Sequence, residues 1–138
     1  MQVLINFVNT KNLPNTYLFL KKHFPSVLKT ECFNEDNLNF EKEVRSTEIG
    51  HLFEHIFIDV LCFEKIKFGF NEAVFNGRTF WNWKRDAFGK FHIYVDIKNE
   101  DGIFLGGAFT KTIGLLEQIL ESNKFFSTDK NFLPVEID

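Results

Sequence analysis

The sequence predicts an α+β domain in which helices pack against an antiparallel sheet. Apolar residues recur at the helical period between residues 46 and 63. Between residues 91 and 97 they instead alternate with polar residues, as in a strand with one buried face. With 138 residues, the chain has the usual length of one domain. We therefore expect a single domain over residues 1–138.

The amino-terminal third predicts a strand, a helix and a second strand. Residues 2–8 are rich in β-forming types and predict the first strand. Apolar residues at helical spacing predict a helix that begins near Pro14 and is closed by Pro25. Residues 27–33 are compatible with a second strand, and a short segment follows around Phe40.

The central helix is expected over residues 46–63. Ser46 and Thr47 are good N-cap residues, and Glu48 suits the positive end of the helix dipole. The residues that give the helical period are Ile49, Leu52, Phe53, Ile56, Val60 and Phe63. This helix should pack one face on the sheet.

Strands and a closing helix are expected in the second half. Residues 65–97 are aromatic, β-branched and interrupted by Asn and Gly, which predicts antiparallel strands joined by hairpins. In the clearest strand Phe91 and Val95 share the apolar face, whereas Tyr94 and Asp96 share the polar one. A turn at residues 99–102 precedes a helix that ends near Ser122.

Composition argues against several classes of partner. The net charge of -3 gives no field that would attract nucleic acid or anionic lipid, so neither is an expected partner. The longest apolar stretch, residues 56–63, is too short to span a membrane. Without a basic leader or a disulfide framework, a cytoplasmic protein with two buried thiols, Cys32 and Cys62, is expected.

Aromatic and basic residues are interleaved between Phe80 and Arg85. If this segment is a strand, Trp81 and Trp83 share one face and could stack the bases of a single strand of nucleic acid. Because no wider basic stripe accompanies them, packing in the core is the favoured interpretation.

The central helix carries His51, Glu54 and His55 in the order HxxEH. Residues four apart lie on one helical face, so the two imidazoles could bind one metal ion with the carboxylate beside them. The same order is a signature of zinc peptidases, although such residues can also form a solvated polar face. The motif predicts a site for zinc or another divalent metal.

A catalytic zinc ion has three protein ligands and an open position, where a nearby base can deprotonate water. His51 and His55 supply two ligands, and Glu54 is the expected general base. Asp96, on the polar face of its strand, is the candidate third ligand. Asp59, one turn beyond His55, suits a carboxylate that orients the His55 ring, and is the rival ligand.

Several of these motifs together resemble the amino-terminal domain of cyanophycin synthetase, over nearly the whole chain. The matching positions are Thr47, Gly50-His51, Glu54-His55, Gly77-Arg78-Thr79, Gly89 and the strand at 91–97. In that family the domain contacts an aspartate–arginine polymer, and in some members it carries a metal-dependent hydrolytic site on the HxxEH helix. The ATP-using polymerising domains follow it in the full enzyme, so this chain is not expected to be a synthetase by itself.

The resemblance implies roles for individual residues. His51 and His55 fall on the metal histidines and Glu54 on the general base. Asp96 matches a glutamate that would be the third ligand, and Asp59 matches a glutamate after the helix motif. Both aspartates are one methylene shorter than the residues they match.

Arg78 and Thr79 are the candidate substrate-binding residues. An arginine in a Gly-Arg-Thr turn can hold a carboxylate through two hydrogen bonds, which suits an aspartate-backbone polymer. The alternative for Arg78 is a surface residue with a partner in its loop.

The favoured function is a metal-dependent, peptidase-like hydrolase acting on a peptide or polyamide, such as a cyanophycin-like polymer. The alternative is a non-catalytic polymer-binding or assembly module with the same fold, whose Phe-rich surface packs on a partner. The sequence leaves homo-oligomer formation open.

Overall fold

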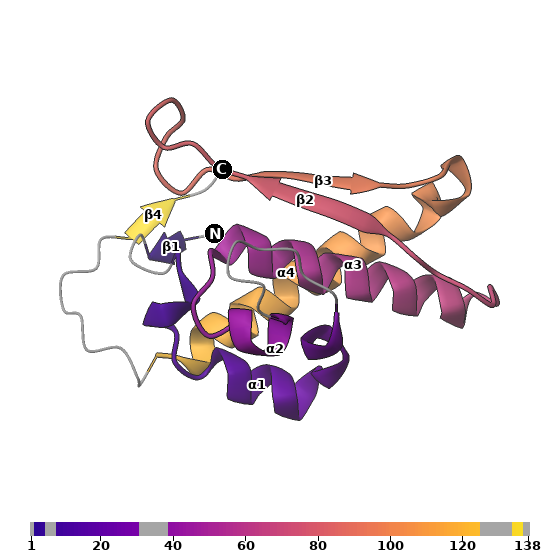
Figure 1. Ribbon diagram of the computed structural model, residues 1–138, viewed down its shortest axis with the longest axis horizontal. Helices are drawn as coiled ribbons and strands as arrows, with labels where there is room; N and C mark the ends of the chain where they lie inside the picture. The colour runs from indigo at the N-terminus through magenta and orange to yellow at the C-terminus, as the bar shows by residue number, and fades with distance from the viewer. Residues whose placement is uncertain (1, 5–7, 31–38, 125–133, 137–138) are drawn as a thin grey trace.

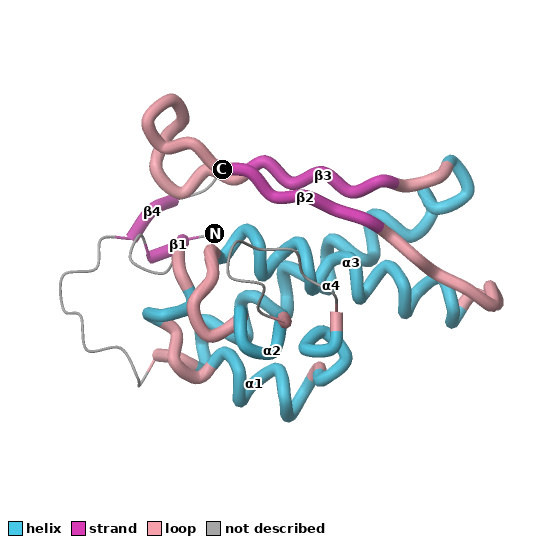
Figure 2. The backbone as a smooth tube through the Cα atoms, in the orientation of Figure 1, coloured by secondary structure: helices cyan, strands magenta, loops and turns pink. Residues whose placement is uncertain are grey.

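The computed structural model has an α+β fold and describes residues 2–4, 8–30, 39–124 and 134–136 (Figure 1). Its elements, coloured by type in Figure 2, are β1 (Gln2–Leu4), η2 (Thr10–Asn12), α1 (Thr16–His23), η3 (Pro25–Lys29), α2 (Phe40–Glu43), α3 (Ile49–Lys67), β2 (Asn76–Phe80), β3 (His92–Asp96), η4 (Asn99–Asp101), α4 (Gly102–Ser122) and β4 (Pro134–Glu136). The predicted fold class is confirmed.

Helix α3 lies at the centre of the fold. In Figure 1 the β2–β3 hairpin lies along one side of α3, with α1 and α2 on the opposite side and α4 behind. The most deeply buried apolar side chains come from α3 and the elements around it, and include Leu20, Val27, Phe40, Leu52, Ile56, Leu61, Ala108 and Ile119. Burial of each large apolar side chain contributes roughly 1.5–3 kcal/mol, so this helix anchors the surrounding elements.

Two glycines allow the hairpin to approach α3 closely. A Cβ atom added at Gly77 would lie 2.8 Å from Ile58 Cδ1 and 3.2 Å from Glu54 Cγ. One added at Gly50, on α3, would lie 2.8 Å from Cβ of Phe91 and closer still to its ring. The absence of both side chains brings the hairpin against the part of α3 that carries Glu54.

The structure corrects the predicted second strand. The predicted helix α1 is confirmed, but Pro25 begins the 3-10 helix η3, and the residues after it do not form a strand. Proline fixes φ near the helical value, and Val27 and Leu28 are buried on one side of the short helix. Residues 31–33 of that prediction lie outside the described residues.

The central helix is confirmed, with different ends. It begins at Ile49 with Glu48 as its N-cap residue, so the predicted caps Ser46 and Thr47 were wrong. The Thr47 hydroxyl lies instead next to a histidine ring of α3. The helix continues beyond the predicted end to Lys67. In its last turn Lys65 forms an ion pair with Asp101, with 2.7 Å between Nζ and Oδ1.

The antiparallel hairpin is confirmed, but its connection is a loop. Strand β2 ends at Phe80, so Trp81 and Trp83 do not share a strand face. Neither belongs to the buried core; both rings instead contact Phe91, at centroid distances of 5.8 and 5.7 Å. Core packing was therefore the wrong interpretation of these two residues.

The last described elements are α4 and β4. Helix α4 ends at Ser122, as predicted, and β4 pairs antiparallel with β1. In the described part of the chain, residues 99–122 are long and apolar enough to cross a membrane by length and composition, and 22% of the most apolar window is buried. The sequence-based argument considered only residues 56–63 and overlooked this helix, although length and composition alone do not identify a membrane span.

Candidate metal centre

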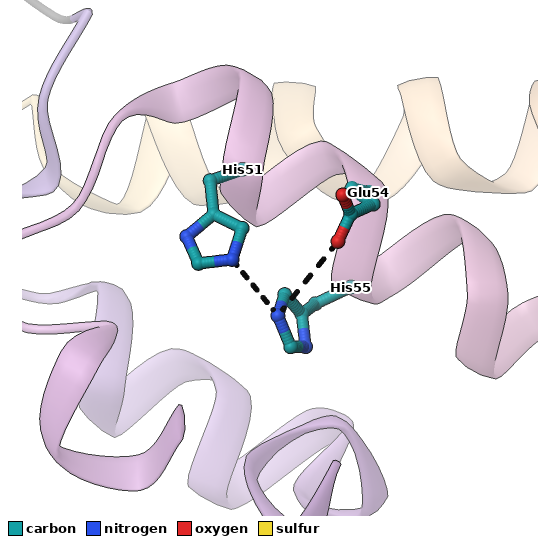
Figure 3. A group of neighbouring side chains, drawn as sticks. All are labelled: His51, Glu54 and His55. Atoms are coloured by element: carbon teal, nitrogen blue, oxygen red, sulfur yellow. Dashed lines mark hydrogen bonds and ion pairs between the residues drawn. The ribbon is translucent and has the colours of Figure 1, made fainter. Parts of the chain in front are cut away.

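Three side chains of α3 converge on one point. His51, Glu54 and His55 each offer a ligand atom, and these atoms lie within 4.8 Å of one another (Figure 3). The two Nε2 atoms of the histidines are 3.1 Å apart. Oε2 of Glu54 is 4.0 Å from Nε2 of His55. The i, i+3, i+4 spacing accounts for the convergence, because such residues share a helical face.

The ring of His55 is held from both sides. Its Nδ1 atom is 2.6 Å from Oγ1 of Thr30, and Phe40 stacks on the ring with 3.7 Å between the centroids. The Thr30 hydroxyl donates its only proton to the carbonyl of Val27, at 2.7 Å. With the Thr30 hydroxyl donating to Val27, Nδ1 of His55 carries the proton that Thr30 accepts, which leaves a lone pair on Nε2.

A second threonine supports His51. Oγ1 of Thr47 is 2.8 Å from Nδ1 of His51. A hydroxyl can donate or accept, so two arrangements are available. In one, Nε2–H of His51 donates to the lone pair of His55 and Thr47 donates to Nδ1. In the other, His51 donates through Nδ1 to Thr47, and both Nε2 lone pairs face the same point.

The second arrangement fits a metal ion. Zinc–nitrogen distances of 2.0–2.1 Å in a tetrahedral site place two nitrogen ligands about 3.3 Å apart. The observed separation of 3.1 Å between the Nε2 atoms is close to that value. Ligand histidines usually bond through their other nitrogen to a fixed partner, as both rings do here. The cluster of His51, Glu54 and His55 could therefore hold a metal ion.

Burial keeps both imidazoles neutral near pH 7, which is the form that binds metals. His55 is only 5% exposed, and its pKa is lowered to about 3 by burial and, secondarily, by the charge on His51. Burial also lowers the pKa of His51.

Glu54 lies between the histidines and the hairpin. The residue is 6% exposed, and its Oε1 atom accepts a hydrogen bond from Thr79 Oγ1 at 2.9 Å. Burial raises the pKa of Glu54, and the hydrogen bond from Thr79 opposes part of that rise. A carboxylate with a raised pKa is a stronger base, while its Oε2 atom faces His55.

The two candidate aspartates lie elsewhere. Asp96 is exposed and pairs in register with Asn76. It lines an open cavity of about 340 Å³ next to Lys65 and is not part of the histidine cluster. Asp59 accepts a hydrogen bond from Ser26 Oγ at 2.5 Å, and its pKa is raised by burial against the effect of that bond. In the described residues it is Thr30, not Asp59, that contacts Nδ1 of His55.

The candidate substrate-binding residues lie on opposite faces of β2. Thr79 points toward α3 and contacts Glu54, whereas Arg78 is exposed, with its guanidinium 5.4 Å from the ring centroid of Phe80.

Of the two cysteines, Cys62 is half-buried. Its thiol donates to the carbonyl of Ala73, and its pKa is raised chiefly by burial. Cys32 lies outside the described residues.

Three residues that support the site were not predicted for that role: Thr30, Phe40 and Thr47. Thr47 lies four residues before His51, so its spacing was a usable signal. Thr30 lies 25 residues before His55, and nothing in the local pattern connects them.

No protein-family model matches this sequence, and neither a curated protein nor a solved structure matches the chain.

Proposed function

We propose that this chain is a zinc-dependent hydrolase of the HxxEH type that cleaves an amide bond in a peptide or polyamide. The observation that carries the proposal is the pair of Nε2 atoms 3.1 Å apart, each on a ring whose Nδ1 lies against a threonine hydroxyl. Two neutral imidazoles arranged in this way are suited to a divalent ion.

Each residue of the cluster has a distinct part in the proposal. His51 and His55 would bind zinc, which when present makes water acidic enough to deprotonate near neutral pH. Glu54 would accept that proton at Oε2, the oxygen that Thr79 does not bond. Burial, which raises the pKa of Glu54, supports this role because it strengthens the base.

The proposed substrate class rests on the resemblance to the amino-terminal domain of cyanophycin synthetase. An aspartate–arginine polyamide is the first substrate to assay, with unrelated peptides as comparison. Glu54 and Thr79 both belong to motifs that carry the resemblance, and they contact each other here.

A non-catalytic metal-binding module is the second candidate. Among the described residues, only two imidazoles and one carboxylate converge in the cluster. If Glu54 itself binds the metal, no carboxylate of this cluster is left to act as a base. That arrangement would bind an ion without hydrolysing a substrate.

The experiment combines metal analysis with a substitution that is conservative in shape. Protein purified without a histidine tag should contain about one zinc ion per chain, and H51A/H55A should lose it. E54Q should retain zinc but lose hydrolysis of the aspartate–arginine polymer or peptides. E117Q, at an exposed carboxylate on α4, is the matched control and should retain both.

The outcomes separate the two candidates. Zinc binding with no hydrolysis of any substrate by the unaltered protein would favour the non-catalytic module. No metal after reconstitution would overturn both.

A further inference from the structure

The outer face of the β2–β3 hairpin presents aromatic rings and an arginine to solvent. Arg78 and Tyr94 are partners in the strand register, and Phe80 lies beside both. Phe80 and Tyr94 are 49% and 55% exposed, with 6.0 Å between their ring centroids. We call Arg78, Phe80 and Tyr94 the hairpin face. Thr79, between Arg78 and Phe80 in β2, contacts Glu54 of α3. The hairpin face therefore lies on the opposite side of the sheet, away from α3.

The adjacent loop continues this surface with rings and cations. Trp81 and Phe88 are large aromatic residues that are 42% and 52% exposed. The exposed basic residues of the loop are Lys84, Arg85 and Lys90. Among the described residues, no ion pair neutralises these three cations or Arg78. Asp86 interacts electrostatically with Arg85 and Lys90 but forms its ion pair with His92, and the Arg78 guanidinium lies 5.4 Å from the ring centroid of Phe80. Cations and rings thus lie side by side on an exposed surface.

The local charge is opposite in sign to that of the chain. Residues 76–98 contain five basic and two acidic residues, a net charge of +3, whereas the whole chain has a net charge of -3. The hairpin and its loop are therefore a confined positive region on an acidic protein. Such a region complements a polyanion at short range without attracting one over long distances.

We propose that the hairpin face and its loop bind single-stranded nucleic acid. Unpaired bases would stack on Phe80 and Tyr94, and the phosphates would contact Arg78 and the loop cations. A duplex covers the faces of its bases, so it could use only the cations. An acidic polypeptide could likewise pair with the cations, but it has no bases to stack on the rings.

The binding test uses a fluorescently labelled oligouridine of about ten nucleotides, the range of a short single-strand site. Fluorescence anisotropy with the full chain should show saturable binding at low salt. The logarithm of the affinity should fall with the logarithm of the salt concentration with a slope of about -2 to -3, as expected for three or four phosphate contacts. A duplex of the same length should bind at least about tenfold more weakly, because it cannot stack on the rings.

Substitutions separate stacking from charge. F80A and Y94A should each weaken binding about fivefold to a hundredfold, the loss expected for one stacked base. F63A removes a ring that is similarly exposed on α3 and should leave binding unchanged. R78Q and R85Q should weaken binding and flatten the salt dependence, whereas K124Q, at an exposed lysine beyond α4, should not. The charge variants decide the matter if a ring variant does not fold.

Three results would overturn the proposal. They are no binding at low salt, equal affinity for the duplex, and displacement by polyglutamate as effective as displacement by unlabelled oligouridine. The proposal does not rest on the metal centre. We therefore expect chelator treatment to leave oligouridine binding unchanged. Its failure is therefore distinguishable from failure of the hydrolase proposal.

Discussion

The hydroxyl of Thr30 fixes how His55 can react. By donating to the carbonyl of Val27 and accepting from Nδ1 of His55, it keeps the proton of the ring away from Nε2. Phe40 stacked on the same ring limits its rotation. The lone pair at the candidate centre is thus set by residues that would never touch a metal.

Replacement of Thr30 tests this arrangement. T30V retains the shape of the side chain but removes the acceptor, so we expect zinc affinity to fall about 10- to 100-fold. Competition with a chromophoric chelator measures the affinity. T110V, which removes an exposed hydroxyl bonded to its own helix, is the matched control and should have no effect. Equal affinities for the two variants would contradict the assigned role.

Acid should destabilise the metal-free protein through His55. Its pKa is about 3 in the folded state against 6.5 as the reference value, so the unfolded chain takes up a proton first as the pH falls. The contribution to stability is complete above pH 6.5 and is lost as the pH falls toward 3, by up to roughly 1.4 kcal/mol per pH unit.

Urea unfolding in the presence of chelator, at a series of pH values, measures this dependence. H55Q should show a shallower loss of unfolding free energy between pH 6.5 and 3. Glu54 has a raised pKa and acts with the opposite sign, so the comparison between the two proteins isolates the histidine. Parallel curves would show that His55 is not buried as a neutral ring.

At the scale of elements, the contact between α3 and the hairpin depends on glycine. G50A should displace Phe91 and destabilise the fold by about 1–3 kcal/mol, because the new methyl group would overlap that side chain. G114A, on α4, meets nothing within 4 Å and should instead stabilise by about 0.5–1 kcal/mol. Chemical denaturation compares both with the unaltered protein, and a neutral G50A would contradict the close approach.

The elements that could be predicted are those that bury one regular face. The helical period around Leu52 and the alternation around Val95 predicted α3 and β3 because each packs that face on the core. The alternation also indicates where Asp96 lies. Since Val95 packs on the core, its neighbour must point away from α3, and Asp96 is exposed. The third-ligand hypothesis did not use that constraint.

Other features depend on tertiary contacts that local sequence does not report. Val27 has a strand-forming side chain, yet Val27 and Leu28 are both buried residues of a 3-10 helix that Pro25 begins. The pair of His51 and His55 could be predicted because both lie on one helix, whereas the contact with Thr30 joins separate elements. Contacts between residues close in sequence could be predicted, whereas the contact between Thr30 and His55, 25 residues apart, could not.

For the whole molecule, the candidate centre connects several elements. Its rings and carboxylate belong to α3, while their partners lie in the segment after η3, in α2 and in β2, at Thr30, Phe40 and Thr79. An ion bound there would be bound only in the folded state, and would therefore stabilise the entire domain.

Zinc should consequently raise the thermal midpoint of unfolding. At a free concentration 100 times Kd, the added stability is about 2.7 kcal/mol. Calorimetry of the chelated protein before and after addition of zinc measures the shift. H51A/H55A should show none, and an equal shift in that variant would place the bound ion elsewhere.

The position of the whole candidate cluster on one helix also bears on the order of folding. His51, Glu54 and His55 span little more than one turn of α3, so their geometry is reached as soon as that turn forms. The slow step in forming an isolated helix is its nucleus, and an ion bridging residues four apart would offset that cost. Bound metal would therefore hold this turn of α3 together from within the helix, while Thr30, Phe40 and Thr79 hold the same residues from the elements around it.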